Sequence, residues 1–311
     1  MSPVDGRLYV ERPFDDAAAI DRALERARVA QRDWAQRPLP ERCALLSRAV
    51  DAFVAKGAEI APEISWQMGR PVRHAPGEVR GFEERARYML SIAAAVLAPV
   101  DPGEKAGFAR QIKRVPLGVV AVVAPWNFPY LTAVNAIWPA LIAGNAVVLK
   151  HSHQTPLCAE RFAEALAAAG MPAHVFQYLC LSHGDTSRLM ADARIANVCF
   201  TGSVAGGHAV VEAIGRGFAT AGLELGGKDP AYVRADANLA HAIDSLTDGA
   251  FFNAGQSCCG IKRIYVAAPV YQAFVDGVVE LTHRYQLGSP LDPETTLGPV
   301  VRTSAAEAVR D

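Results

Sequence analysis

The chain has 311 residues, 51% of them hydrophobic and 20% charged, and its 31 basic and 32 acidic side chains leave a formal net charge of −1. This length and hydrophobicity exclude disorder and predict about two domains, and the balanced charge gives no broad attraction to nucleic acid or anionic membrane. We expect a soluble, cytoplasmic protein, because no apolar stretch approaches the ~20 residues of a membrane span and the N-terminus lacks the pattern of a signal peptide.

The first hundred residues are predicted to be helical. Residues 15–36, 39–56 and 78–97 each place apolar side chains three and four positions apart, with turn signals between them. Residues 101–107, Asp-Pro-Gly-Glu-Lys-Ala-Gly, are rich in turn formers and end this helical part.

Strands and helices alternate after this break. The pattern predicts strands at 108–115, 119–123, 146–150, 175–178, 195–200 and 219–223, and helices at 131–142, 157–168 and 204–214. Short apolar strands separated by helices are typical of a parallel sheet that is covered on both faces by its crossover helices. The predicted fold class is therefore α/β.

A second unit is predicted to begin near Gly226-Gly227, which divides the chain into domains of 1–226 and 227–311. The second domain contains predicted helices at 239–252 and 270–285 and a strand at 263–266. The pattern of its last residues is that of a helix interrupted at Asp311, so we expect this domain to be incomplete.

The six cysteines, at positions 43, 158, 180, 199, 258 and 259, form no CxxC pair and no spacing typical of metal ligands, so no metal site is predicted. Flanking apolar residues favour a role as small buried hydrophobic side chains for most of them. Cys258 and Cys259 differ, because they lie in the polar, glycine-flanked segment 253–260, where a thiol is accessible.

Three polar residues at or near strand ends each allow a structural and a functional interpretation. Asn127 stands between two prolines and is either a turn or helix-capping residue or an amide donor at the end of a strand. Lys150 either extends its ammonium to water or meets a nucleotide. Glu224, just before two glycines, is either an ordinary turn-adjacent carboxylate or an active-site acid.

The segment Thr201-Gly-Ser-Val-Ala-Gly-Gly207 follows a strand and opens a helix, where free backbone N–H groups bind phosphate well. Its glycine spacing is not that of GxGxxG, so a structural turn remains the alternative.

These features follow one another in a fixed order. They are Pro125-Trp-Asn-Phe-Pro129, Lys150, Phe200-Thr-Gly-Ser203, Leu223-Glu-Leu-Gly-Gly-Lys228 and Asn253-Ala-Gly-Gln-Ser-Cys258. Together they strongly resemble the NAD(P)-dependent aldehyde dehydrogenase superfamily. The resemblance reaches back to Gln67-Met-Gly-Arg-Pro71 and forward to Leu297-Gly-Pro299, so it covers nearly the whole chain.

The resemblance implies a Rossmann-like nucleotide-binding domain, a partial α/β catalytic domain and three catalytic residues. Cys258 would attack the aldehyde as a thiolate, which requires help from a base or a positive dipole because a free thiol has a pKa near 8.5. Asn127, with the backbone N–H of Cys258, would hold the oxyanion. Glu224 would activate the water that hydrolyses the thioester. Cys259 is interpreted as structural.

The resemblance also implies NAD or NADP as cofactor. Lys150 is similar to the lysine that reaches the adenosine ribose or its 2′-phosphate, and Trp126 to a strand-end residue beside the cofactor. Gly202, Ser203 and Gly207 belong to the turn and helix start on the pyrophosphate side. His153 stands where NAD-preferring members often carry a glutamate, so NADP is not excluded.

Two regions bear on assembly and substrate choice. Residues of about 100–116 include a segment, 108–115, that resembles the family's bridging strand, which implies a homo-oligomer. The Glu-x-Phe-Gly-Pro motif and the C-terminal assembly strand of the family are not found, so the sequence is that of a fragment or of a truncated member. The aldehyde is not identified, and Phe128, Trp138 and Ser257 are predicted near its funnel.

Three other functions remain as alternatives. In an acylating enzyme, coenzyme A would replace water, although Glu224 then has no purpose. A truncated chain could bind nucleotide without catalysis. A cysteine hydrolase using Cys258 fits least, because no histidine is close to this residue in sequence.

Overall fold

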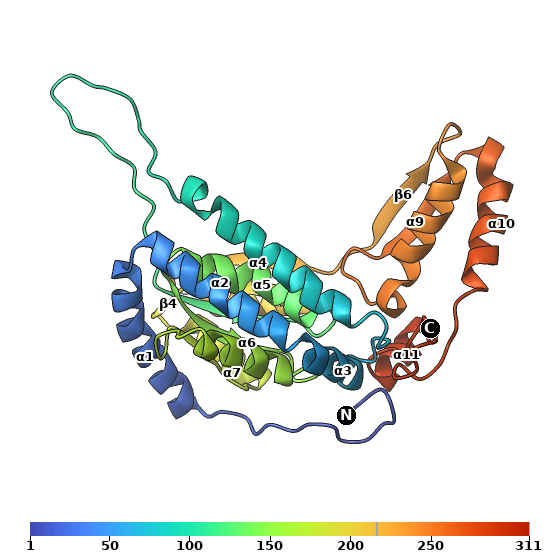
Figure 1. Ribbon diagram of the computed structural model, residues 1–311, viewed down its shortest axis with the longest axis horizontal. Coiled ribbons are helices and arrows are strands. Elements are labelled where there is room, and N and C mark those ends of the chain that lie inside the picture. Colours follow the sequence, from blue (N-terminus) through green and yellow to red (C-terminus); the bar gives the residue numbers. More distant parts are fainter. Residues whose placement is uncertain (216, 311) are drawn as a thin grey trace. The chain divides into compact units, whose positions relative to one another are not determined.

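Two units, each with its own sheet, make up the structure, a computed structural model that describes residues 1–215 and 217–310 (Figure 1). The larger unit comprises Arg12–Gly57 and Glu78–Glu224, and the smaller comprises Met1–Glu11, Ala58–Gly77 and Leu225–Asp311. The break at 224/225 lies close to the predicted boundary. The segments Met1–Glu11 and Ala58–Gly77 nevertheless group with the C-terminal part, a long-range association that periodicity does not reveal.

The larger unit has the predicted alternation of strands and helices. Its elements are α1 Ala17–Gln36, α2 Leu39–Ala55, α4 Pro76–Val96, β1 Val119–Val123, α5 Pro129–Ile142, β2 Ala146–Lys150, α6 Leu157–Ala168, β3 Phe176–Tyr178, α7 His183–Ala191, β4 Ile195–Gly202, α8 Val204–Ile214 and β5 Thr220–Leu225. The predicted α/β class is confirmed. Helix α7 was not predicted, because its nine residues contain few apolar positions.

The five strands of the larger unit form one sheet in the order β3-β2-β1-β4-β5. β1 is parallel to both β2 and β4, and Val123 lies beside Lys150 of β2 and Phe200 of β4. The chain builds outward from β1 to β3 and then returns to the other side of β1. This reversal creates a topological switch point at the carboxyl ends of β1 and β4, the place where open α/β sheets bind ligands.

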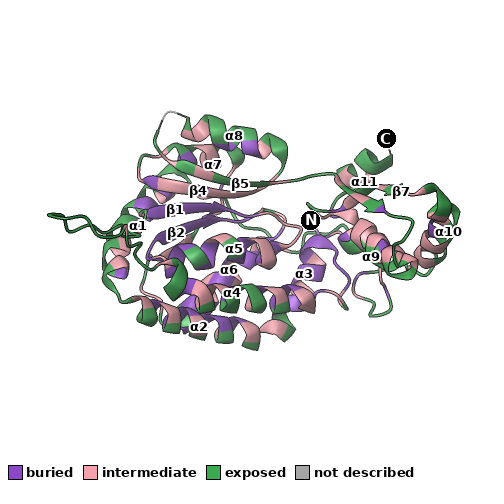
Figure 2. Cartoon of the chain, turned by 90° about the horizontal axis from the view of Figure 1, so that it is seen from above, coloured by how far each residue is buried: buried purple, intermediate pink, exposed green. Residues whose placement is uncertain are grey.

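Helices cover both faces of this sheet, as Figure 2 shows. α1, α7 and α8 pack against the face that presents Val119, Ala121 and Val123, and α5 contacts the opposite face. Every residue of β1 and β2 is buried, as expected for central strands of a parallel sheet. Beyond α5, an aromatic cluster joins four helices through the fully buried rings of Phe53, Phe82, Tyr130, Trp138 and Phe162.

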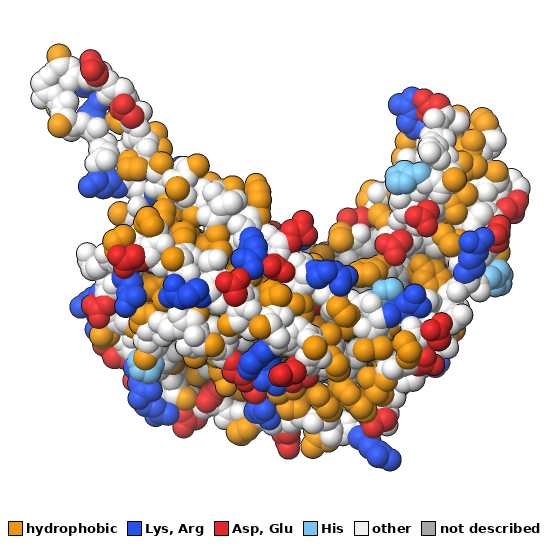
Figure 3. All heavy atoms as spheres, in the orientation of Figure 1, with side chains coloured by type: hydrophobic (Ala, Val, Ile, Leu, Met, Phe, Trp, Pro, Cys, Tyr) orange, Lys and Arg blue, Asp and Glu red, His pale blue; other side chains and the backbone are white. Residues whose placement is uncertain are grey.

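The segment between α4 and β1 forms a long arm (Figures 1 and 3). The strand predicted at 108–115 was wrong for this chain, since the segment holds only isolated antiparallel bridges, Val100 with Ile112 and Lys105 with Phe108. Several apolar side chains of the arm are exposed, namely Val100, Phe108, Ile112, Val115 and Leu117. Extended backbone without a neighbouring strand does not form a ladder. Pairing with a second copy stays a prediction, for which the sedimentation coefficient is the check.

The smaller unit contains a two-stranded parallel sheet with β6 Asp229–Val233 and β7 Ile261–Val266. Its helical elements are α3 Gly57–Met68, α9 Leu239–Phe251, η1 Phe252–Gly255, η2 Ala268–Val270, α10 Tyr271–Thr282 and α11 Thr303–Arg310. α3 and β6 were not predicted. Asp311, where a helix was predicted to be interrupted, lies outside the described residues. Among the helices of residues 1–215 and 217–310, none combines the length and apolar composition that crossing a membrane requires.

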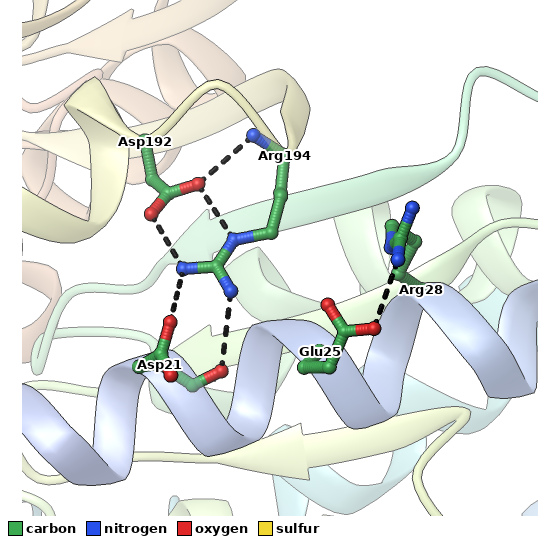
Figure 4. A network of polar contacts seen from close by, with 5 residues as sticks. All are labelled: Asp21, Glu25, Arg28, Asp192 and Arg194. Atoms are coloured by element: carbon green, nitrogen blue, oxygen red, sulfur yellow. Dashed lines mark hydrogen bonds and ion pairs between the residues drawn. The ribbon is translucent and has the colours of Figure 1, made fainter.

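An ion-pair network fastens α1 to the turn between α7 and β4 (Figure 4). The guanidinium of Arg194 donates two hydrogen bonds to the carboxylate of Asp192, at 2.8 and 2.9 Å, and forms an ion pair with Asp21 of α1 at 2.8 Å. These hydrogen bonds hold the pKa of Asp192 below its ordinary value. Asp192 therefore contributes stability above its unfolded pKa, and this contribution is lost as the pH falls through its lowered folded pKa.

We predict that Arg194→Met lowers the free energy of unfolding by about 1–2 kcal/mol at pH 7, allowing for the partial exposure of the pair. The difference from the parent chain should begin to narrow as the pH falls below about 4, the ordinary pKa of an aspartate in the unfolded chain, and should disappear only below the lowered pKa of Asp192 in the folded chain. Urea denaturation at pH 7 and pH 3 measures both quantities. Arg28→Met, which removes only an exposed pair with Glu25, is the control and should leave stability unchanged. An equal loss at both pH values would rule out an ionic origin.

Candidate functional site

Three strand ends of the larger unit meet at one edge of its sheet. The half-buried turn that contains Trp126 and Asn127 follows β1, Lys150 ends β2, and β4 ends at Gly202 directly before Ser203. The parallel register places Lys150 and Phe200 on either side of Val123. The predicted residues Trp126, Asn127, Lys150, Gly202 and Ser203 are therefore brought to a single edge, at the topological switch point.

Lys150 is buried, with 6% of its surface exposed. Burial lowers the pKa of its ammonium group, because removal of water disfavours the charged form. The interpretation of Lys150 as a lysine that extends to water is therefore wrong. A buried amine at a sheet edge is suited to an anionic or hydroxyl-rich ligand, which restores the favourable contacts that burial removed.

The start of α8 is built around the ring of Phe200. Ser203 caps the helix, and its Oγ accepts a hydrogen bond from the N–H of Gly206 at 3.1 Å. A Cβ atom on Gly202 or Gly206 would collide with the Phe200 ring, so a side chain at either position forces this ring to shift. Ser203 and the two residues that follow it are exposed, and amides this early in a helix precede its internal hydrogen bonds.

Gly207 differs from the other predicted residues of this turn. It is buried, and its N–H donates to the carbonyl of Ser203 at 2.9 Å. Its amide is therefore already used within the helix. Gly207 belongs to the packing of α8, while Gly202 and Ser203 lie at its open end.

The N-terminus of α5, at the same edge, is already occupied by a carboxylate of the chain. Glu78 is 1% exposed, and its Oε2 accepts hydrogen bonds from the N–H groups of Tyr130 and Leu131 at 3.0 and 3.1 Å. An anion that approaches this edge therefore meets a negative charge at α5 and an open helix start at α8. No sequence signal pointed to Glu78, since it lies 52 positions from Tyr130.

Two histidines follow Lys150. His151 is buried, which lowers its pKa to about 4. Its Nδ1 accepts from the N–H of Ser152, so the Nε2–H donates to the carbonyl of Pro129 at 3.1 Å. His151 is therefore a neutral structural residue that ties the β2 loop to the start of α5.

His153 is half-buried and more open to ligands. Its Nε2 lies 2.6 Å from the carbonyl of Leu181, and its ring packs against Phe14 and, at 6.3 Å between centroids, His183. Burial lowers its pKa, and the charges of Lys150 and His183 lower it further. The ring is thus held neutral by its own surroundings. His183 was missed by sequence reasoning, because an isolated histidine at a helix start gives no signal.

A pocket of about 190 Å³ opens beside these histidines. Its lining includes His151, Ser152 and His153 after β2, Tyr178 and Cys180 at the end of β3, and Arg12 and Asp15 from the segment before α1. The volume is below the roughly 300–1,000 Å³ of a complete small-molecule site. It suits one part of a larger ligand.

Glu224 is exposed and occupies the next-to-last position of the edge strand β5. Its neighbours Leu223 and Leu225 are half-buried, so the carboxylate belongs to the open face of that strand. The structure places Glu224 inside β5, whereas the sequence pattern predicted that the strand ends at residue 223. Its role as an active-site acid stays a prediction.

Cys258 lies in the smaller unit, exposed in a turn from Ser257 to Gly260. Its carbonyl accepts from the N–H of Gly227 at 3.1 Å. Burial raises the pKa of the Cys258 thiol, and the charge of the adjacent Cys259 raises it further. In this conformation the thiol is therefore mostly protonated at neutral pH, and a nucleophilic role requires a proton acceptor.

Of the remaining predictions from the sequence, some are confirmed by the structure and others are wrong. Trp138 was predicted near a substrate funnel, but it is fully buried against Phe82 and Phe162. The prediction was wrong because Trp138 lies on the inward face of α5. Its closeness to Asn127 in sequence did not reveal this orientation. Cys158 is buried as expected, whereas Cys43, Cys180 and Cys199 are only half-buried. Within the part of the chain that the structure describes, no cluster of three or more His, Cys, Asp or Glu side chains is suited to a metal ion.

Comparisons with known proteins agree with one another. The model of the aldehyde dehydrogenase family matches residues 1–311. The chain is 35% identical over 308 residues to 3,6-anhydro-alpha-L-galactose dehydrogenase of Streptomyces coelicolor, covering 97% of this chain and 61% of the relative. It is 33% identical over 315 residues to an NADP(+) succinate-semialdehyde dehydrogenase of Deinococcus radiodurans, covering 100% and 64%.

A solved structure shows the same fold. PnpE of Pseudomonas sp. WBC-3, crystallised with nicotinamide adenine dinucleotide, superposes with a TM-score of 0.95 at 32% identity, over 99% of this chain and 63% of that one. The chain thus spans a little under two thirds of the length of these relatives.

The packing of Phe200 under the start of α8 gives a stability prediction. Gly206→Ala should lower the free energy of unfolding by about 1–3 kcal/mol, because the added methyl group overpacks the ring. Shortening the ring with Phe200→Leu in the same chain should recover part of the loss. Urea denaturation measures both. Gly184→Ala, in the first turn of α7, is the control, since its added Cβ would meet nothing closer than 3.9 Å. Equal losses from the two alanine variants would contradict the role assigned to Phe200.

Proposed function

The chain belongs to the aldehyde dehydrogenase family, and from this premise we propose that it oxidises an aldehyde to a carboxylic acid with NAD or NADP. The observation that carries the proposal is the meeting of the Trp126–Asn127 turn, Lys150 and Ser203 at one sheet edge of the larger unit. Two of its relatives are named as dehydrogenases of different compounds, one a semialdehyde and the other an anhydro sugar. We therefore propose aldehydes as the substrate class and name no particular aldehyde.

The residues at this sheet edge fit a nicotinamide dinucleotide. The exposed start of α8 at Ser203 offers N–H groups to a pyrophosphate, and the buried amine of Lys150 offers a donor to a ribose hydroxyl or a 2′-phosphate. Trp126 contributes the half-buried surface next to them. When bound, the cofactor supplies a hydride acceptor.

Cys258 is proposed as the nucleophile. Its thiolate attacks the aldehyde carbon, the carbonyl π electrons move to oxygen, and a thiohemiacetal oxyanion forms. The Asn127 amide and the Cys258 backbone N–H donate hydrogen bonds to that oxygen, each worth about 2.7–4 kcal/mol in comparable sites. Collapse of the oxyanion with loss of hydride leaves a thioester on Cys258.

Glu224 is proposed as the base of the second step. Its carboxylate takes a proton from water, the resulting hydroxide adds to the thioester carbon, and the Cys258 thiolate leaves as the carboxylic acid is released. The exposure of Glu224 supports this role, because a base that acts on water needs access to it. A base is superfluous if coenzyme A resolves the thioester, so hydrolysis is favoured over acyl transfer.

Substitution of the three residues should separate the two steps. Cys258→Ala should abolish hydride transfer, and Glu224→Gln should release one NAD(P)H per chain as a burst and then turn over slowly. Asn127→Ala should slow the first step about 10²–10³-fold without a burst. Stopped-flow absorbance of NAD(P)H measures all three, and Cys259→Ala is the control that should keep the parent rate.

Two outcomes would reject these assignments. If the Glu224→Gln chain turns over at the parent rate, Glu224 is not the base. If the Cys258→Ala chain still oxidises aldehydes, Cys258 is not the nucleophile. If the parent chain binds cofactor without any hydride transfer, the chain is a nucleotide-binding protein and the proposed oxidation is wrong.

His153 is proposed to decide between the two cofactors. His153→Glu should weaken NADP binding about tenfold, because a carboxylate repels a 2′-phosphate across a partly hydrated gap, while NAD binding should be kept. Fluorescence titration with each cofactor measures the ratio of the two dissociation constants. His153→Gln is the matched neutral control. If His153→Glu weakens both cofactors equally, the residue does not discriminate between them.

A further inference from the structure

The segment that leads to Cys258 has a strained backbone. Asn253, Ala254 and Gly255 are consecutive and all have positive φ, at 54°, 56° and 71°. Only the last of these is a residue that adopts this region at no steric cost. Such a run persists only where surrounding contacts impose it.

Side-chain hydrogen bonds of Asn253 supply these contacts. Its Oδ1 accepts from Nε of Arg70 at 3.2 Å, and its backbone carbonyl accepts from the Gln256 side chain at 3.0 Å. In return, its Nδ2 donates to the Gln256 carbonyl at 3.4 Å. Arg70 and Asn253 are 3% and 8% exposed, so water does not replace these bonds easily.

Gln256 extends the network to a third segment. Its Oε1 accepts a hydrogen bond from the N–H of Val301 at 2.8 Å. Gly69, next to Arg70, faces the Leu297–Pro299 segment so closely that a Cβ on Gly298 would collide with the Gly69 carbonyl. The two motifs without an assigned role, 67–71 and 297–299, therefore form one wall of the smaller unit, and Arg70 connects that wall to the Cys258 segment.

We propose that Arg70 is a positioning residue for Cys258, which it holds in place through Asn253 and the left-handed turn. The proposal rests on the proposed function only in treating Cys258 as the nucleophile. Arginine suits this task because its planar guanidinium directs Nε–H along one fixed line, whereas a lysine ammonium rotates and has no such direction. Gln256 and the N–H of Gly227 then fix the two sides of the turn that carries the thiol.

The test follows the turn and the thiol directly and needs no turnover. Variants are made in a Cys259→Ala chain, amide hydrogen exchange is followed over residues 253–260, and the iodoacetamide rate of Cys258 is measured from pH 6 to pH 10 by peptide mass spectrometry. Arg70→Met should speed exchange of these amides about tenfold, as the loss of a coupled contact does. It should also move the pH midpoint of alkylation down toward that of an ordinary thiol, because opening of the turn removes the partial desolvation that raises the pKa of Cys258.

Three further variants separate geometry from charge and from general stability. Arg70→Lys keeps the charge but not the fixed donor, so it should behave like Arg70→Met. Asn253→Gly tolerates the positive φ but loses the side-chain bonds, so it should give the same shifts, and Arg70→Met should add nothing to it. Arg73→Met removes an exposed arginine of the same segment and is the control, expected to match the parent.

Each result decides the proposal. Parent-like exchange and an unchanged pH midpoint in Arg70→Met would overturn it, as would full additivity of Arg70→Met and Asn253→Gly. If Arg70→Met does not fold, Arg70→Lys decides, since it keeps the charge and a long side chain but loses the fixed Nε–H donor. A chain that shows the predicted shifts but oxidises no aldehyde disproves the proposed function and leaves the positioning role intact.

Discussion

The parallel pairing of β1 with both β2 and β4 is the constraint on which the larger unit depends. It makes β1 the centre of the sheet and brings the ends of three strands to one edge. Residues separated by up to about eighty positions, from Trp126 to Ser203, come to the same edge of the sheet because parallel strands end on the same side. Both β1 and β2 are fully buried, so these two strands form the interior of the larger unit behind that edge.

Burial away from water lowers the pKa values of the basic side chains at this edge of the sheet. Burial lowers the pKa of Lys150, His151 and His153, since each loses the hydration that stabilises its cationic form. Glu78 adds a buried carboxylate at α5, where it satisfies two backbone amides. The result is an edge with an open helix start at α8, a buried amine and two imidazoles whose pKa values are lowered by burial.

In the smaller unit, hydrogen bonds between distant segments, rather than a large sheet, hold the candidate residues in place. Its two-stranded sheet is small, and the segment before Cys258 is held in a left-handed conformation by hydrogen bonds from distant segments. Close backbone contact at Gly69 and Gly298 brings those segments together. A reactive thiol on a loop requires such external support, because a short turn does not fix a side chain by itself.

The sequence by itself determined the α/β class and the bounds of four elements, namely helices at 157–168 and 204–214 and strands at 119–123 and 146–150, which have the predicted limits in the structure. Apart from the strand predicted at 108–115, the other predicted elements differ from the observed ones by one to three residues at an end. Periodicity and turn residues are local signals, and these elements are locally encoded. The order of motifs also identified the family, because motif spacing is a property of the chain alone.

Only the tertiary structure decided what depends on contacts between distant residues. It buried Lys150 and Trp138, brought the carboxylate of Glu78 in α4 to the N-terminus of α5, stacked His183 beside His153 and joined Arg70 to Asn253. It also left residues 108–115 without a strand, because a strand needs a partner and the described chain supplies only isolated bridges. Burial, pKa shifts and side-chain pairing depend on which distant segments pack together. The pattern of any single segment of the sequence does not specify those contacts.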